Sequence, residues 1–138
     1  MALHIIKLCV GVDDIAEMYQ WVKDAKAGCE DLGHTTRMFP RRQEEILPGG
    51  SLYWVIRGAI MCRQPIADLV SVRGKDGIER CRIAFKPQII PVRPTPRRAI
   101  QGWRYLEADD APPDLTKKAI KEAIPPKMRR ELAELGLL

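Results

Sequence analysis

The feature that most constrains the fold is a strict alternation of side chains in residues 51–57 (SLYWVIR). Leu52, Trp54 and Ile56 occupy every second position of this segment. Because successive side chains of a β-strand point to opposite faces, this spacing predicts a strand whose three apolar residues are buried. Such a strand must pair with others, so we expect the chain to build a sheet.

The same criteria predict further strands around this one. Residues 78–85 alternate apolar side chains with arginines, so one face is expected to be apolar and the other cationic. The preceding segment 74–77 (GKDG) is typical of a hairpin turn, and Gly58 indicates a bulge. A strand over residues 4–10 is also predicted, and we expect it to be central. The remaining strands are predicted over residues 34–39, 59–63, 66–72 and 100–106. Pro65 is expected to interrupt the chain between the strands 59–63 and 66–72.

Prolines limit what residues 87–96 can form. Pro87, Pro91, Pro94 and Pro96 all lack the N–H donor that a strand ladder requires. We therefore expect this segment to be an extended edge or a wrapping loop.

One long helix is predicted near the start of the chain. Its apolar residues lie on one helical face, after Asp13 and Asp14 and before a left-handed cap at Gly28, with Trp21 at the edge of the face. These apolar residues are Ile15, Met18, Tyr19, Val22 and Ala25. Shorter helices are predicted over residues 41–47, with Pro40 in the first helical position, and over 116–123 and 126–135, the last with Leu132 and Leu135 as its apolar edge.

These elements together predict an α+β fold. A mixed, mainly antiparallel sheet or partial β-barrel is expected, with an N-terminal helix and short C-terminal helices. We expect a single domain over residues 1–115 and a helical extension over 116–138. The architecture is similar to that of PUA-like RNA-binding barrels, without a shared motif.

Several classes of protein and site are excluded by what the sequence lacks. No apolar run reaches the roughly 18–20 residues of a membrane-spanning helix, and the start resembles no export signal, so we expect a cytoplasmic protein without membrane contact. Cys9, Cys29, Cys62 and Cys81 form no Cys-x-x-Cys pair, and we expect reduced thiols. Cys29 and His34 alone are too few ligands for a metal, and no cofactor or catalytic motif is present.

Basic residues concentrate in the middle of the chain. Residues 37–104 hold 14 Lys and Arg against 5 Asp and Glu, a net charge of +9, whereas the two flanks together have −4. Twelve of these 14 residues are arginines, which bind phosphate or carboxylate with two parallel hydrogen bonds and stack on bases. An anionic ligand is one explanation. The alternative is a basic solvent face that acidic helices neutralise from the side.

Three segments combine arginine with groups that could bind a nucleic acid. Residues 35–42 place Arg37, Arg41 and Arg42 around a predicted helix start, or around an ordinary solvated turn. Residues 49–58 place Tyr53 and Arg57 on the face opposite the core, although a second core layer would equally explain Tyr53. The third segment, residues 96–106, contains Arg97, Arg98, Gln101, Trp103 and Arg104, which suit a stacked base, or its aromatic residues pack in the core.

These segments also carry a resemblance to a known family. The blocks 34–42, 49–58 and 97–106, with residues 3–11 and 111–115, resemble domain-of-unknown-function family fourteen-eighty-nine. This family consists of short, mostly alphaproteobacterial proteins without an assigned activity. The resemblance therefore implies no functional residue.

The charge map favours a module that binds RNA or another polyanion. In this interpretation the arginines contact phosphates, and Tyr53, Trp103 and Gln101 stack on or read bases. A second hypothesis is an enzyme for a nucleotide or phosphorylated small molecule, with Asp68 as acid or base. A third is a protein-interaction adaptor that docks through residues 87–96 and the C-terminal helices. The oligomeric state is left open.

Overall fold

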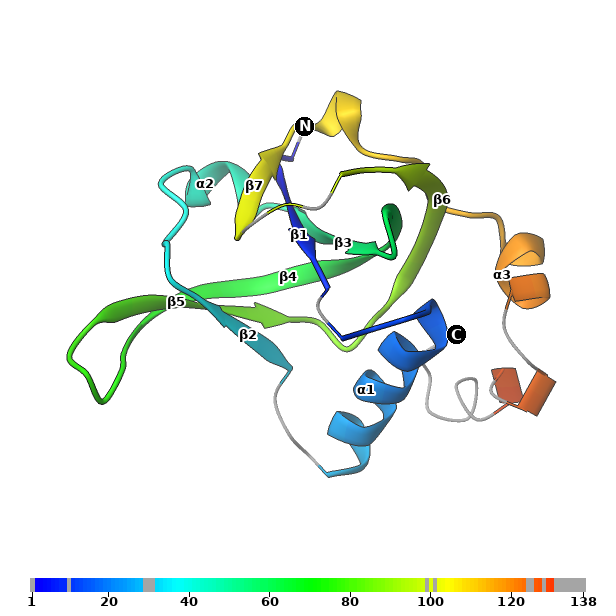
Figure 1. The fold of residues 1–138 in the computed structure, drawn as a ribbon, viewed down its shortest axis with the longest axis horizontal. Helices are drawn as coiled ribbons and strands as arrows, with labels where there is room; N and C mark the ends of the chain where they lie inside the picture. Colours follow the sequence, from blue (N-terminus) through cyan, green and yellow to red (C-terminus); the bar gives the residue numbers. More distant parts are fainter. Residues whose placement is uncertain are drawn as a thin grey trace.

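The protein is an α+β structure built on one seven-stranded sheet (Figure 1). The computed structural model describes residues 2–9, 11–28, 32–98, 100, 102–123, 126–127 and 129–130. In chain order the elements are β1 (His4–Leu8), α1 (Ile15–Ala27), β2 (Gly33–Thr36), α2 (Gln43–Ile46), β3 (Ser51–Ile56), β4 (Ala59–Arg73), β5 (Glu79–Phe85), β6 (Ile90–Pro96), β7 (Trp103–Leu106), the 3-10 turn η1 (Ala108–Asp110) and α3 (Lys117–Ala123). No helix of the described residues is long and apolar enough to cross a membrane.

The sheet is mixed and mainly antiparallel, as predicted. Its strands follow the order β2-β5-β4-β3-β1-β7, and β6 pairs with β4. Among these pairs, β1 and β3 run parallel, while the others are antiparallel. The opening strand β1 lies between β3 and β7, which confirms its predicted central place.

Strand β4 is the common partner of three other strands. Its first half pairs with β3 and β6, and its second half pairs with β5. The predicted break at Pro65 is wrong, because β4 continues through it. The Pro65 carbonyl accepts a hydrogen bond from Lys86 N, so the missing N–H does not interrupt the pairing.

The predicted bulge at Gly58 is wrong, because Gly58 lies in the turn between β3 and β4. Arg57 (φ 50°) and Gly58 (φ 82°) both have positive φ, and Ile56 pairs with Ala59 across them. This is the backbone of a two-residue hairpin turn, which matches the right-handed twist of the flanking strands. The bulge lies instead at Met61, which is the extra residue in β4.

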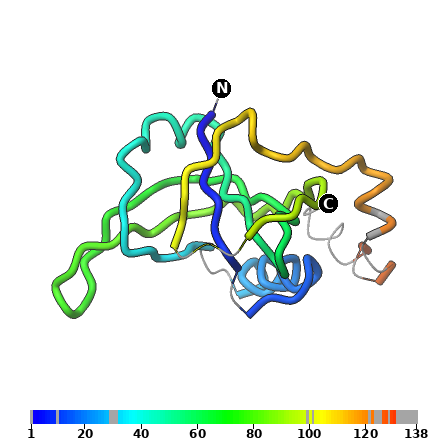
Figure 2. The backbone as a smooth tube through the Cα atoms, turned by 45° about the horizontal axis from the view of Figure 1, so that its top comes forward, coloured from blue at the N-terminus to red at the C-terminus, as the bar shows by residue number. Residues whose placement is uncertain are grey.

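The first of two cores lies between the sheet and helix α1 (Figure 2). The helix buries Met18, Tyr19, Val22 and Ala25 as predicted, and the Asp14 side chain caps its start by accepting from Glu17 N. Gly28 ends the helix with φ −85°, so the left-handed cap predicted there is wrong. Leu52, Trp54 and Ile56 of β3 are buried in this core, which confirms the alternation.

A second, smaller core lies on the opposite face of β3. Its buried residues are Ile6, Tyr53, Val55, Ile60, Val92 and Leu106. The expectation that this face is open is therefore wrong. Strand β3 is buried on both faces because distant residues of β6 and β7 supply a second cover.

Other predicted elements are present with changed limits. Strand β6 is an edge strand, as its prolines predict, joined by an isolated bridge between Val92 and Asp114. Strand β7 begins at Trp103, after Gly102 with φ +71°. Helix α2 begins at Gln43, so Pro40 is not its first residue. The part of the last predicted helix that carries Leu132 and Leu135 lies outside the described residues.

We predict that Trp54→Ala destabilises the protein by ~3–5 kcal/mol. Trp54 is 4% exposed, and its Nε1 donates to Gln64 Oε1 at 3.2 Å. The substitution creates a cavity and removes the hydrogen-bond partner of a buried amide. Urea denaturation measures the loss, and a value below about 1 kcal/mol would contradict the assigned face.

We also predict that Arg57→Asn stabilises the protein by about 0.5–1 kcal/mol, since asparagine tolerates positive φ better than arginine. Gly58→Ala should do the opposite, although nothing lies within 4 Å of an added Cβ. Thermal and urea unfolding of the two variants should move in opposite directions. A shift of both in the same direction would argue against the turn geometry.

Candidate functional site

The candidate site lies where the segment that follows β2, at one end of the strand order, contacts β7 at the other end. The segment after β2 runs to α2 and contacts β7 on its way (Figure 1). Trp103 Nε1 donates to the Met38 carbonyl at 3.0 Å, and Arg42 N donates to the Tyr105 hydroxyl at 3.2 Å. The fold therefore joins two of the three arginine-containing segments, which are far apart in sequence. We call residues 37–42, Trp103, Tyr105, Lys7 and His34 the seam.

A row of side chains crosses the sheet beside this contact. Lys7 on β1 lies opposite Trp103 on one side and opposite Trp54 on the other, and directly opposite residues share a face. The His34 ring lies 5.9 Å from the Trp54 ring at an angle of 84°. Trp103, Lys7 and Trp54 thus lie in a row on three neighbouring strands, and His34 of β2, which does not pair with β3, joins this row through its ring contact with Trp54.

Lys7 and His34 were not among the predicted site residues. The sequence feature that could have indicated Lys7 is its position: it is a cation at a core-facing position of an otherwise apolar strand. The proximity to His34 required knowledge of how the sheet curves.

The seam carries positive charge that nothing described in the structure neutralises. Within the described part of the chain, the side chains of Lys7, Arg37 and Arg41 form no hydrogen bond or ion pair, and both arginines are exposed. Burial, together with the nearby Lys7 ammonium, lowers the pKa of His34. His34 is therefore neutral at neutral pH, and the charge comes from Lys7 and the two arginines.

Arg42 has a structural role in the seam. Its guanidinium binds Glu45 at 2.6 and 2.9 Å and Glu107 at 3.2 Å, and it lies 5.3 Å from the centre of the Tyr105 ring. The hydrogen bonds from Arg42 lower the pKa of Glu45. Helix α2 has four residues, so the predicted anion site at its start is not supported.

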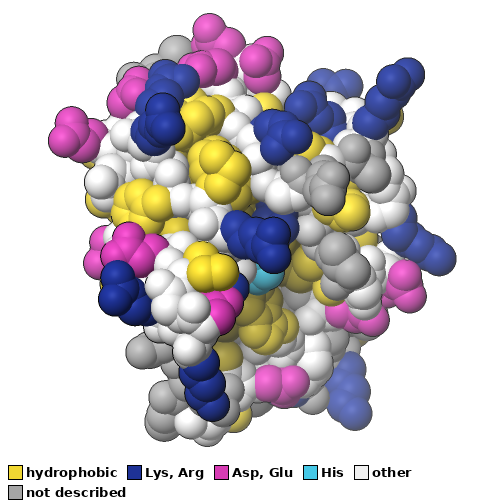
Figure 3. All heavy atoms as spheres, turned by 60° about the vertical axis from the view of Figure 1, so that its left-hand side comes forward, with side chains coloured by type: hydrophobic (Ala, Val, Ile, Leu, Met, Phe, Trp, Pro, Cys, Tyr) yellow, Lys and Arg dark blue, Asp and Glu magenta, His cyan; other side chains and the backbone are white. Residues whose placement is uncertain are grey.

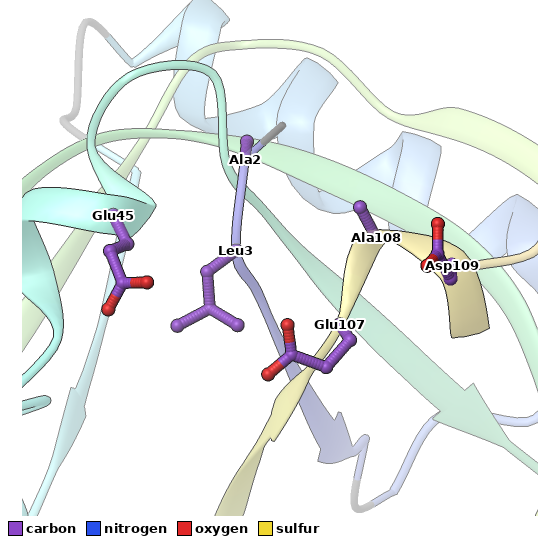
Figure 4. Close-up of a pocket in the computed structure, with 6 residues that line it drawn as sticks. All are labelled: Ala2, Leu3, Glu45, Glu107, Ala108 and Asp109. Carbon is purple, nitrogen blue, oxygen red and sulfur yellow. The ribbon is translucent and has the colours of Figure 1, made fainter.

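A hollow next to Arg42 has acidic walls. Figure 4 shows Glu45 and Glu107 on either side of Leu3, with Asp109 farther along the wall. Ala2 and Ala108 complete the lining. Among the described residues that line this hollow there is no arginine, and its carboxylates disfavour an anionic ligand.

A second basic group surrounds the β3–β4 turn. Arg97 N donates to the Gly58 carbonyl at 2.8 Å, which places Arg97 and Arg98 beside Arg57. Arg57 makes a long ion pair with Asp13 at 3.7 Å, and both side chains are 73% exposed. In the described part of the protein, Arg97 and Arg98 are exposed and their side chains have no partner. We call Arg57, Arg97 and Arg98 the turn cluster.

Residues 97–104 lead from the turn cluster to the seam. Gln101 lies outside the described residues, and Arg104 Nη1 donates to the Trp103 carbonyl at 3.0 Å. Basic side chains also lie next to hydrophobic ones over the side of the molecule that Figure 3 shows.

Tyr53 does not belong to an open face. It is 4% exposed in the second core, and its ring lies 5.1 Å from that of His4. The second-core-layer interpretation is therefore correct for Tyr53, and the expected stacking on a base is not supported.

A polar network that the sequence did not reveal borders Tyr53. Ser51 N donates to His4 Nδ1 at 3.0 Å, Arg63 Nη1 donates to Ser51 Oγ at 2.8 Å, and Arg63 binds both Asp114 carboxylate oxygens at 2.8 and 2.9 Å. Burial and the Arg63 charge lower the pKa of His4, against the opposing effect of Asp114. Because Ser51 is fully buried, we assign the network to anchoring the segment around Asp114.

The described cysteines are free thiols, and Cys29 lies outside the described residues. Burial raises the pKa of both Cys9 and Cys81 to about 11, and it raises the pKa of Cys62 further. These thiols are poor nucleophiles at neutral pH. Among the described residues, no group of three or more His, Cys, Asp or Glu could hold a metal ion.

Comparison with known proteins gives one match. A family model described as a protein of unknown function (DUF1489) matches residues 5–138. No curated protein matches the chain. No solved structure matches it either, so the likeness to PUA-like barrels stays a prediction.

We predict that the stability of the protein falls as the pH drops through about 6.5. Both histidines have a lowered pKa in the folded state, so the unfolded chain takes up protons first as the pH falls. This proton uptake stabilises the unfolded state relative to the folded state. Urea denaturation at about pH 7.5 and 5.5 measures the difference. The double variant His4→Asn with His34→Gln, which keeps an acceptor for Ser51 N, should reduce this pH dependence, and an unchanged dependence would contradict the assignment.

Proposed function

We propose that this chain, which belongs to the DUF1489 family of proteins of unknown function, binds RNA or another polyanion through the seam and the turn cluster. The observation that carries the proposal is the division of the arginines into two groups. One group is paired with carboxylates, and the other is exposed without partners in the described structure.

The paired group supports the fold. Arg42, Arg63 and Arg80 bind carboxylates at 2.6–2.8 Å, and Arg73 lies 3.6 Å from Glu79. Nearby carboxylates neutralise this group, although only Glu45 among them lies on a helix, whereas the alternative explanation for the basic composition expected acidic helices.

The unpaired group requires another explanation. Among the described arginines of the base-rich region 37–104, it consists of Arg37, Arg41, Arg93, Arg97 and Arg98. Arg37 and Arg41 belong to the segment that Trp103 contacts through the Met38 carbonyl, and Arg97 and Arg98 lie in the turn cluster. Exposed guanidinium groups of this kind suit the phosphates of a polyanion, which they bind with two parallel hydrogen bonds. In this proposal Arg57 and Arg104 add charge, and Gln101 contacts a base.

The enzyme hypothesis finds less support in the geometry. Asp68 is exposed on β4, where its carboxylate accepts from Leu69 N at 2.8 Å. Neither Asp68 nor an arginine is among the described residues that line the hollow next to Arg42. A binding surface spread over two basic groups fits the observations better than a catalytic pocket.

We predict that Arg97→Ala with Arg98→Ala weakens binding to oligo(U) RNA and flattens its salt dependence. Each phosphate contact contributes a slope of about −0.7 in log affinity against log salt on a single strand, so the slope should fall in magnitude by roughly one to two. Fluorescence anisotropy at a series of salt concentrations measures the slope.

The matched control is Arg73→Ala with Arg80→Ala, which removes the same charge from arginines that already face Glu79 and Asp76. Its slope should equal that of the parent protein. Equal slopes in all three proteins would show that the turn cluster contacts no phosphate. Absence of binding to both oligo(U) and heparin at low salt would overturn the proposed function.

A further inference from the structure

We infer that the seam binds an unpaired nucleobase of a single-stranded nucleic acid, stacked on the ring of Trp103. The inference rests on the proposed function and narrows it from a polyanion to a strand with accessible bases. Contacts within the protein hold the ring of Trp103 in place.

The polar group of Trp103 is already satisfied inside the protein. Its Nε1 donates to the Met38 carbonyl at 3.0 Å, while the side chain remains partly exposed. The hydrogen bond fixes the orientation of the ring. The side chain also packs against the first core, so the sequence alternative of core packing holds in part, and what it leaves to solvent is ring carbon, on which a base can stack.

The ring is also supported by Tyr105. The two rings lie 4.9 Å apart at 74°, an edge-to-face arrangement. Tyr105 is held in turn, because its hydroxyl accepts from Arg42 N and its ring lies beneath the Arg42 guanidinium. Arg42 is fixed by Glu45 and Glu107. Little side-chain freedom remains to be lost when a base stacks on this support.

The surroundings of the ring suit a nucleotide. Lys7 lies opposite Trp103 in the sheet, and Arg37 and Arg41 belong to the segment that Trp103 contacts. These cations can bind the phosphates on either side of a stacked base. Met38 is 69% exposed and adds apolar surface next to them.

This arrangement favours a single strand over a duplex. Bases in a duplex are stacked on each other and paired, so their faces are not available to a protein ring. A surface made for duplex backbone alone needs cations but no held aromatic ring. The combination of unpaired cations with a fixed ring therefore indicates an unpaired base.

The test compares four labelled probes of about ten nucleotides, within the range bound by single-strand modules. These probes are oligo(U) RNA, oligo(dT) DNA, an abasic deoxyribose-phosphate strand of the same length and a blunt RNA duplex. We expect tighter binding of oligo(U) and oligo(dT) than of the abasic strand by roughly 5- to 150-fold, the effect of stacking one base. A preference between the first two probes distinguishes RNA from DNA.

The variant Trp103→Ala separates stacking from a structural role. We expect it to bind the abasic strand as the parent does and to lose the preference for strands with bases. A merely structural role of Trp103 would instead displace Arg37 and Arg41 and weaken the binding of every probe. Trp103→Phe, which keeps a ring, should restore part of the preference. Ile78→Ala, which truncates another exposed apolar side chain away from the seam, should bind as the parent does.

Failure of this inference is distinguishable from failure of the proposed function. Equal binding of the abasic strand and of oligo(U) by the parent protein would overturn the base site while leaving polyanion binding intact. Tighter binding of the duplex than of either single strand would also overturn it. Absence of binding to all four probes and to heparin would remove both proposals.

Discussion

The pairing along β4 is the constraint on which the rest of the structure depends. This one strand of 15 residues pairs with β3 and β6 through its first half and with β5 through its second half. The bulge at Met61 lets Ile60 face the second core while Cys62 faces the first. Strand β4 holds β5, which pairs with β2, and its neighbour β3 holds β1, which pairs with β7, so the two strands at the seam depend on β4 and β3 through one intermediate strand each.

The seam follows from a sheet that curves without closing. A closed barrel would pair β2 with β7 through backbone hydrogen bonds, whereas here a side-chain donor, Trp103 Nε1, reaches the Met38 carbonyl. An opening in a sheet can admit water, so Lys7 can occupy a core-facing position without a buried counterion. The same opening leaves Trp103 partly exposed beside cations.

Local pattern predicted much of the fold but little of the site. The alternation around Trp54, the stripe around Tyr19 and the prolines of β6 are periodic or covalent features, and the local sequence predicts the element that each of them forms. Tyr53 was misplaced because its cover comes from Val92 and Leu106, which no local period reveals. The sequence predicts Arg37 and Arg41 as candidate site residues. It predicts neither that Arg42 is paired while these two are not, nor that their segment contacts Trp103. Both facts depend on contacts between residues far apart in the chain.

Strand β6 has a consequence for the behaviour of the protein at high concentration. Three of its seven residues, Pro91, Pro94 and Pro96, have no N–H, and the Arg93 N–H is already bound to the Pro113 carbonyl. Few donors therefore remain along this border to template a strand from a neighbouring molecule. The prolines thus hinder the addition of a strand from another molecule at this edge of the sheet, where unpaired backbone groups would otherwise favour ordered self-assembly.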